Sequence, residues 1–102
     1  CEVARLLGVR FVDAALYSTK TPTIAASEYK LYATELSRRV ADATMDIVGP
    51  GAQLALGTED APLKGRAESC YPYTVIDTIG GGSSEIQKNI IAKRKLDLPK
   101  NF

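Results

Sequence analysis

The most informative segment of the chain reads Thr78-Ile79-Gly80-Gly81-Gly82-Ser83-Ser84-Glu85-Ile86-Gln87-Lys88-Asn89-Ile90-Ile91-Ala92-Lys93-Arg94. It predicts a glycine loop that leads directly into a short amphipathic helix. Consecutive glycines allow positive φ angles and let another molecule approach the backbone without meeting a Cβ. Ser83 and Ser84 are both N-cap candidates, and Ser84 with Gln87 has the spacing of a capping box. The first helical N–H groups then point toward the loop, which suits a ligand that carries oxygens or phosphates.

The rest of the chain reads as helices joined by turns. Hydrophobic periodicity predicts helices over residues 2–18, 23–48, 66–79 and 84–95. Gly49-Pro50-Gly51 should end the longest helix, and Pro72 should dent the helix after it. Strand signals are poor, since only Tyr73–Ile76 has β character. We therefore expect an all-α fold, an antiparallel helix bundle with three main helices and a short C-terminal one.

The apolar residues of the first two helices predict different environments. Residues 2–18 are apolar on nearly all sides, which is typical of a helix buried among neighbours. Residues 23–48 have one apolar stripe, and charged residues, including Glu28 and Lys30, are expected on the remaining surface. The predicted core stripe consists of Ile24, Leu31, Tyr32, Leu36, Val40, Ala43 and Ile47.

Length and composition narrow the possible functions. With 102 residues the chain can form one small domain, and 13 Lys and Arg against 12 Asp and Glu do not imply capture of nucleic acid. No apolar run reaches the ~20 residues of a membrane span. The absence of histidine excludes His-based zinc sites and Ser-His catalysis within the chain, and no metal site is expected. The two cysteines, Cys1 and Cys70, form no CxxC pair, so a cytoplasmic setting is the default expectation.

Three blocks of sequence resemble the acyl-CoA dehydrogenase family. The segment Gly81–Gln87 is similar to the family's C-terminal Glu-Gly-Thr-Ser-Glu-Ile-Gln core. The segment Ala26–Glu35 resembles the family's Ala-Ser-x-x-Lys-Leu-Tyr-Ala-Ser-Glu stretch, and Asp46–Gly51 resembles its Gln-Leu-x-Gly-Gly segment. Order and spacing match over residues 24–98, about three-quarters of the chain. Because the chain also starts with Cys1 inside a helical pattern, we expect residues 1–102 to be a single C-terminal bundle domain of a larger flavoenzyme.

The resemblance implies a function for that larger protein. Family members use FAD to oxidise an acyl-CoA to a 2-enoyl-CoA, pass electrons to an electron-accepting flavoprotein, and assemble as homo- or hetero-oligomers. This chain would then supply part of the flavin-pocket wall and of the subunit interface, and would be inactive alone. The candidate cofactor-binding residues are Gly49, Gly81, Gly82, Ser83 and Glu85.

The chain departs from the family at the position of its catalytic base. Many members carry a glutamate where this chain has Gly81, which cannot remove a proton, so no catalytic residue is expected here. Either the base lies on an earlier helix outside the chain, or the parent protein is a silent subunit beside an active partner. At the Gln-Leu-x-Gly-Gly segment, Asp46 and Pro50 replace Gln and Gly.

Several roles stay open on the sequence alone. Gly49 is either a flavin contact of a neighbouring subunit or only a helix stop. Glu85 is either a flavin-side contact or an ordinary acid at a helix N-terminus, and Ser83 a flavin contact or only a cap. The alternative for the whole chain is a non-enzymatic helical interaction module in which the glycines form a linker.

Overall fold

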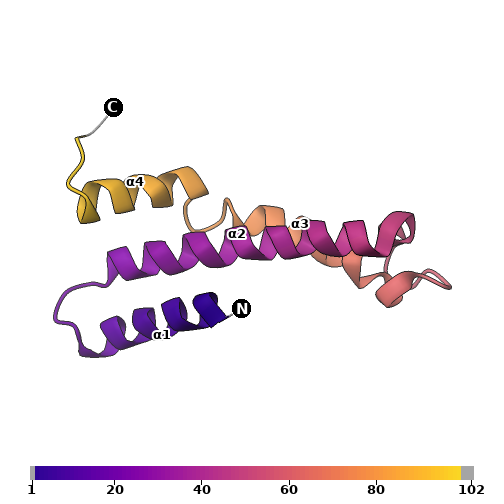
Figure 1. The fold of residues 1–102 in the computed structure, drawn as a ribbon, viewed down its shortest axis with the longest axis horizontal. Helices are drawn as coiled ribbons and strands as arrows, with labels where there is room; N and C mark the ends of the chain where they lie inside the picture. The colour runs from indigo at the N-terminus through magenta and orange to yellow at the C-terminus, as the bar shows by residue number, and fades with distance from the viewer. Residues whose placement is uncertain (1, 100–102) are drawn as a thin grey trace. The chain divides into compact units, whose positions relative to one another are not determined.

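The structure, a computed structural model, describes residues 2–99, and these residues form helices without any strand. Four α-helices and two short 3₁₀ helices follow one another within residues 2–99 (Figure 1). Their bounds are α1 Glu2–Tyr17, α2 Thr23–Val48, η1 Gly49–Gln53, η2 Pro62–Gly65, α3 Arg66–Asp77 and α4 Ser84–Lys95. The predicted all-α architecture is confirmed, with helix ends within two residues of those expected.

Turn residues explain where the longest helix begins and ends. Thr23 is the first residue of α2, directly after Pro22, whose carbonyl accepts the N–H of Ala26 at 2.9 Å. At the other end Gly49 has φ of 75°, which a residue with a Cβ rarely adopts, and α2 stops at Val48. The predicted stop at Gly49-Pro50-Gly51 is therefore confirmed, although the chain continues there as the 3₁₀ helix η1.

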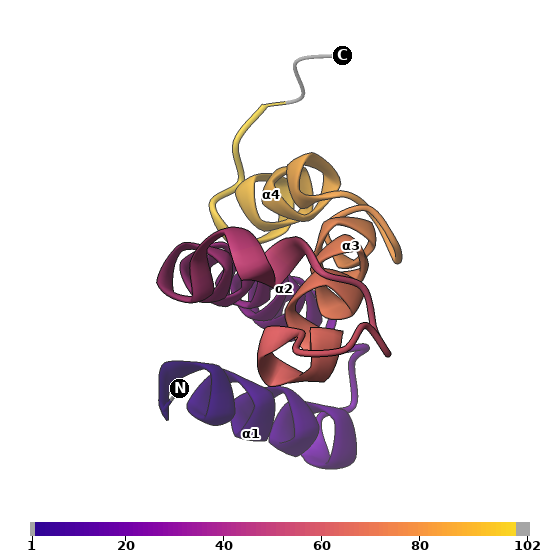
Figure 2. The same ribbon diagram turned by 90° about the vertical axis from the view of Figure 1, so that its right-hand side faces the viewer.

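The chain divides into two compact units, which are best described separately. Of the described residues, 2–33 and 82–99 belong to the first unit and 34–81 to the second. In the first unit the early part of α2 lies between α1 and α4, and both run antiparallel to it (Figures 1 and 2). Gly8 lies close to Tyr29 of α2, because a Cβ at Gly8 would be only 3.2 Å from the Tyr29 ring. One helix turn along, Phe11 stacks on the same ring with centroids 6.2 Å apart.

Glu28 links all three helices of the first unit. Its carboxylate forms ion pairs with Arg10 of α1, at 3.3 Å from Nη1 to Oε2, and with Lys95 of α4. The Glu28 side chain is only 14% exposed, whereas both cations are largely in contact with solvent. The expectation that Glu28 and Lys30 belong to the solvated surface of α2 is therefore wrong, since both are partly buried by neighbouring elements.

Helix α1 is not buried on all sides, contrary to expectation. None of its residues is buried, and its outer face carries a row of exposed apolar side chains. The exposed members are Val3, Leu6, Val9, Val12, Leu16 and Tyr17. The physical reason is that α2 covers one side of α1 and no described segment within its unit covers the other.

The second unit pairs the later part of α2 with α3. The Tyr71 hydroxyl donates a hydrogen bond of 2.8 Å to the Asp42 carboxylate, which joins the two helices. Gly65 lets η2 pack on the preceding loop, because a Cβ there would lie 2.5 Å from the carbonyl oxygen of Ala55. Pro72 lies inside α3, as predicted.

Part of the predicted core stripe of α2 is exposed. Val40 is 57% and Ile47 is 85% exposed, and Ala43 is exposed as well. These positions have the spacing of a core face, but Val40 lines an open groove between α2 and α3 and not a closed core. Fully buried large side chains are absent from residues 2–99.

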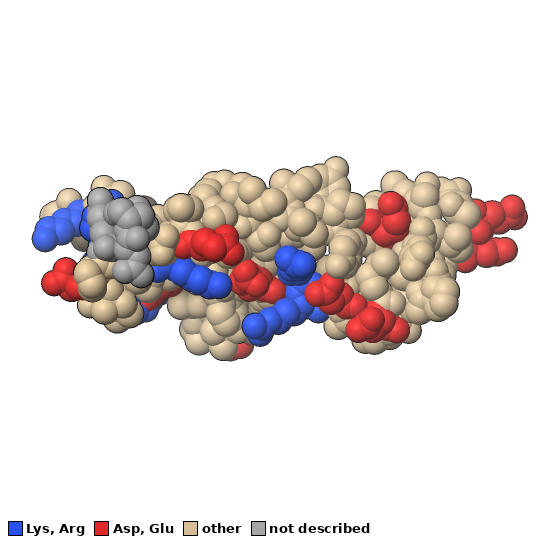
Figure 3. All heavy atoms as spheres, turned by 90° about the horizontal axis from the view of Figure 1, so that it is seen from above, with Lys and Arg blue, Asp and Glu red and all other residues tan. Residues whose placement is uncertain are grey.

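The surface is electrostatically mixed. Figure 3 shows acidic and basic side chains interspersed among uncharged atoms on the face it presents. Over residues 2–99 no helix combines the length and apolar character needed to cross a membrane.

Candidate functional site: the glycine loop and the N-terminus of α4

The segment after α3 turns sharply into the glycine loop. The N–H groups of Ile79 and Gly80 both donate to the carbonyl of Ile76, at 3.0 and 2.8 Å. Thr78 caps the helix and its hydroxyl donates to the carbonyl of Val75 at 2.7 Å. Gly81 then has φ of 68° and Gly82 has φ of 96°. The loop is thus a built turn in which two successive residues need glycine's conformational freedom.

The two glycines differ in what surrounds them. A Cβ on Gly81 would meet nothing within 4 Å, so the space next to this residue is open. A Cβ on Gly82 would lie 2.8 Å from Nε2 of Gln87, closer than real Cβ contacts come. Both glycines are therefore favoured by their backbone angles, and at Gly82 a larger residue would also displace the Gln87 amide.

Ser83 is the N-cap of α4. Its hydroxyl oxygen accepts the N–H of Ile86 at 3.4 Å, and its carbonyl accepts the N–H of Gln87 at 2.9 Å. This confirms one of the two predicted caps. The predicted capping box of Ser84 with Gln87 is wrong, because Ser84 is already the first helical residue and Gln87 points its amide back to the loop.

Glu85 is an exposed acid in the first turn of α4. Hydrogen bonds from its own backbone N–H and from the Ser83 hydroxyl lower the pKa of this carboxyl, and the nearby charge of Lys88 lowers it further. The carboxylate is therefore ionised at neutral pH and complements the positive end of the helix dipole.

Two residues whose contact with the Gly82 carbonyl was not predicted from the sequence hold the loop in place. The ammonium group of Lys30 on α2 donates to the Gly82 carbonyl at 2.7 Å. Nε2 of Gln87 on α4 donates to the same oxygen at 3.4 Å. Gln87 is 6% exposed and Lys30 is half-buried. Sequence spacing could not reveal the Lys30 contact, because 52 residues separate Lys30 from Gly82.

The candidate residues do not all belong to one unit. Gly82, Ser83 and Glu85 lie together on one turn of the first unit. Gly81 and Gly49 belong to the second unit, where Gly49 begins η1 in a left-handed conformation with open space beside it. Gly49 thus acts as a helix stop, and its flavin contact stays a prediction.

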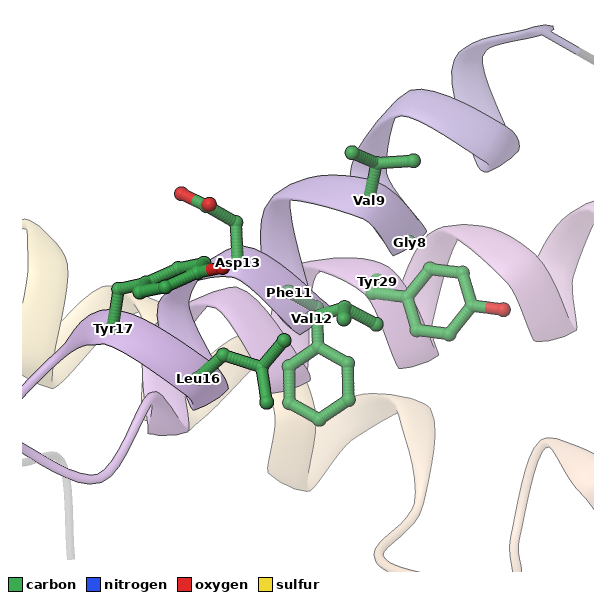
Figure 4. Close-up of a pocket in the computed structure, with 8 residues that line it drawn as sticks. All are labelled: Gly8, Val9, Phe11, Val12, Asp13, Leu16, Tyr17 and Tyr29. Atoms are coloured by element: carbon green, nitrogen blue, oxygen red, sulfur yellow. The ribbon is translucent and has the colours of Figure 1, made fainter.

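Each unit has an open groove that is lined by described residues outside the glycine loop. One, of about 570 Å³, lies on α1 and is lined mostly by apolar side chains, with Tyr29 contributed by α2 (Figure 4). The other, of about 410 Å³, lies between α2 and α3 and includes Arg66 and the exposed free Cys70. Within residues 2–99 no group of His, Cys, Asp or Glu side chains is arranged to hold a metal ion.

Comparison with known proteins identifies the family. The family model described as "Acyl-CoA dehydrogenase, C-terminal domain" matches residues 1–96. Acyl-CoA dehydrogenase FadE26 of Mycobacterium tuberculosis is 36% identical over 75 residues, which are 74% of this chain and 19% of that protein. Acyl-CoA dehydrogenase IpdE1 is 40% identical over 72 residues in Mycobacterium tuberculosis and 39% over 72 residues in Mycolicibacterium smegmatis, covering 70% of this chain and 17% of each relative.

The matches cover most of this chain but only a small part of each relative. The chain spans less than a fifth of the length of these curated relatives. No solved structure matches it. The chain, an all-helical one with the expected glycine loop, belongs to the family of acyl-CoA dehydrogenase C-terminal domains.

Proposed function

We propose that the chain is the C-terminal helical domain of an FAD-dependent dehydrogenase that oxidises an acyl-CoA to a 2-enoyl-CoA. Within that protein it forms part of the wall of the flavin pocket and part of the subunit interface. The observation that carries the proposal is the turn at Gly82 and Ser83, where a left-handed glycine precedes a side-chain-capped helix N-terminus. The names of the relatives support the reaction class, since all three are called acyl-CoA dehydrogenases.

The residues of the loop suit a flavin. The open space beside Gly81 allows a ring system or its phosphates to approach the backbone. The N-terminus of α4 carries a partial positive charge, which favours oxygen-rich groups. When bound, FAD supplies the acceptor for the hydride that leaves the β-carbon of the acyl chain. Gly81, Gly82 and Ser83 would bind and orient it, and Glu85 would lie at the edge of the same turn.

No residue of this loop can remove the α-proton of the substrate. Gly81 occupies the position where many family members carry a carboxylate, and glycine has no side chain to act as a base. The base is therefore supplied either by a residue of the full-length protein outside this chain or by an active partner subunit. In the second case the parent protein is a silent subunit of a heteromeric dehydrogenase.

The exposed apolar surface supports a role in assembly. α1 exposes a row of apolar side chains, and Val40 and Ile47 are exposed on α2. Such surface is uncommon on a free-standing domain and marks contact with other parts of an assembly. We assign it to contacts within the full-length protein and between subunits, and we expect Gly49 to contact the flavin of a neighbouring subunit. An electron-accepting flavoprotein would reoxidise the assembled enzyme.

The full-length protein tests this proposal directly. After purification its visible absorbance shows whether it carries flavin, and an anaerobic titration with acyl-CoA thioesters of different chain length shows whether the flavin is reduced. We expect a flavin spectrum and bleaching of its long-wavelength band by at least one thioester. A protein without flavin would refute the proposal. Flavin that no thioester bleaches would instead identify the silent subunit, and co-purification with a second dehydrogenase subunit should then restore bleaching.

A further inference from the structure

The Gly82 carbonyl is held by two side chains that come from different helices. Lys30 of α2 donates at 2.7 Å and Gln87 of α4 at 3.4 Å, and both hydrogen bonds are partly buried. A carbonyl oxygen has two lone pairs, and here each has a donor. The shorter bond comes from an ammonium group, and charge-assisted hydrogen bonds are the stronger kind. The position of this carbonyl is therefore well determined.

The contacts around Gly82 leave little freedom for another arrangement. Nε2 of Gln87 would lie 2.8 Å from a Cβ at Gly82, so the amide occupies the space that any larger residue needs. Gln87 itself is 6% exposed. Ordering a lysine side chain costs rotamer freedom, and Lys30 is nevertheless half-buried and bonded to the Gly82 carbonyl.

A fixed carbonyl also fixes the next N–H group. The peptide between Gly82 and Ser83 is planar and trans, so its C=O and N–H point in opposite directions. Because the oxygen faces the ammonium group of Lys30, the Ser83 N–H is directed away from that group. Lys30 thus sets the direction of a backbone donor at the start of α4, although it lies 52 residues earlier in the chain.

We propose that Lys30 is a positioning residue for the flavin site. It fixes the Gly82–Ser83 peptide so that the Ser83 N–H is presented to the bound flavin, with Gln87 as a second, weaker support. This inference rests on the proposed function for the identity of the ligand. The orientation of the peptide itself rests only on the contacts of Lys30 and Gln87.

The test compares Lys30→Met with Lys30→Arg in the full-length holoprotein. Methionine keeps much of the apolar stem and removes the donor, whereas arginine keeps a cationic donor. Lys20→Met is the matched control, since Lys20 is exposed in the turn before α2. The readouts are the dissociation constant for FAD, the visible spectrum of the bound flavin, and amide hydrogen exchange of a peptide that covers residues 80–86. Far-ultraviolet circular dichroism reports whether each variant is folded.

We expect Lys30→Met to weaken FAD binding by about tenfold, shift the flavin spectrum and speed exchange at Ser83 by a similar factor. Lys30→Arg should recover most of each change, and Lys20→Met should cause none. A folded Lys30→Met protein with unchanged affinity, spectrum and exchange would overturn the inference. If Lys30→Met does not fold, Gln87→Met serves as the test. We then expect smaller changes in FAD affinity, flavin spectrum and amide exchange, and the absence of all three would overturn the inference. A wild-type protein that binds no flavin refutes the proposed function, and the exchange measurement then still shows whether Lys30 fixes the peptide.

Discussion

At the scale of single residues, the glycines of the loop are not equivalent. Gly80 does not have a positive φ, and a Cβ there would make an ordinary 3.5 Å contact with the carbonyl oxygen of Ile76. Gly82 combines φ of 96° with a position where a Cβ would lie 2.8 Å from Nε2 of Gln87, so the Gln87 amide would have to move. The consecutive glycines therefore differ in whether the structure requires glycine at that position, and substitution by alanine can distinguish them.

We predict that Gly82→Ala destabilises the N-terminus of α4 by about 1–3 kcal/mol, because alanine is strained at this φ and displaces the Gln87 amide. Gly80→Ala is the matched control and should be neutral or stabilising by up to about 1 kcal/mol, since alanine restricts the unfolded chain. Hydrogen exchange of residues 82–90 in the full-length protein measures both. Equal effects of the two substitutions would contradict the distinction drawn between these glycines.

The second prediction at this scale concerns the pH dependence of Glu85. Hydrogen bonds to its own N–H and to Ser83 lower the pKa of this carboxyl below its ordinary 4.5. A lowered pKa means that the ionised form stabilises the folded state above about pH 4.5 and that this stabilisation is lost as pH falls through the lowered value. Glu85→Gln should therefore speed exchange in the first turn of α4 at pH 6, and the difference from wild type should vanish in stronger acid.

Two further variants check the cause of that effect. Ser83→Ala removes one of the groups that lowers the pKa, so the wild-type acid transition should move to higher pH. Glu59→Gln, an exposed acid in the loop before η2, serves as the control and should leave exchange in α4 unchanged at every pH. A pH-independent effect of Glu85→Gln would mean that the carboxylate acts by packing and not by charge.

At the scale of elements, the first unit depends on one carboxylate. Glu28 of α2 pairs with Arg10 of α1 and with Lys95 of α4, and it is the most buried of the three side chains. Its Oε2 atom is buried and receives no hydrogen bond among the described residues, although Arg10 lies 3.3 Å away. Removing the charge of Glu28 should thus affect two helices, whereas removing either cation should affect mainly one.

We predict that Glu28→Gln destabilises the docking of α1 and α4 by about 1–2 kcal/mol in total, because partly exposed ion pairs contribute about 0.2–1 kcal/mol each and the remaining polar atom is poorly satisfied. Arg10→Gln should loosen α1 and Lys95→Gln α4, each by less. Hydrogen exchange resolved by helix distinguishes these cases, with α3 of the second unit as the internal reference. Loss of protection confined to α2 would contradict the linking role.

The ends of the helices could be predicted from the sequence, whereas their burial and their contacts with one another could not. Helix ends followed from local chemistry: Gly49 and Ser83 act on their immediate neighbours, so their signals can be read from one sequence. The exposure of α1 and of Val40 could not be predicted, because apolar periodicity shows which face of a helix is suited to packing but not whether a packing partner lies in this chain. The Lys30 contact was missed for a related reason, since it depends on the packing of α4 against α2.

At the scale of the whole chain, the described residues bury little apolar surface, and this limits the stability of the chain on its own. Apolar burial is the dominant favourable term in folding, and fully buried large side chains are absent from residues 2–99. The chain also spans less than a fifth of the length of its curated relatives. Those proteins therefore contain further segments that could cover the surfaces exposed here. Among the described helices, α1 carries the most exposed large apolar side chains.

This predicts the behaviour of residues 1–102 expressed alone. The isolated chain should be helical by circular dichroism but should self-associate at micromolar concentration and melt over a broad temperature range, because its apolar faces have no partner. Replacing Leu6, Val9 and Leu16 by glutamine should reduce association without restoring a sharp transition, since those changes remove exposed apolar surface but add no core.

The control is a variant that combines Lys20→Gln, Lys64→Gln and Glu59→Gln. It leaves the apolar row of α1 intact and should leave association unchanged. Sedimentation velocity and thermal melts at several concentrations measure these effects. A monomer that melts in one sharp, concentration-independent step would show that the few buried contacts of the two units suffice for an independent domain, and the assignment of the apolar faces to assembly would then fail.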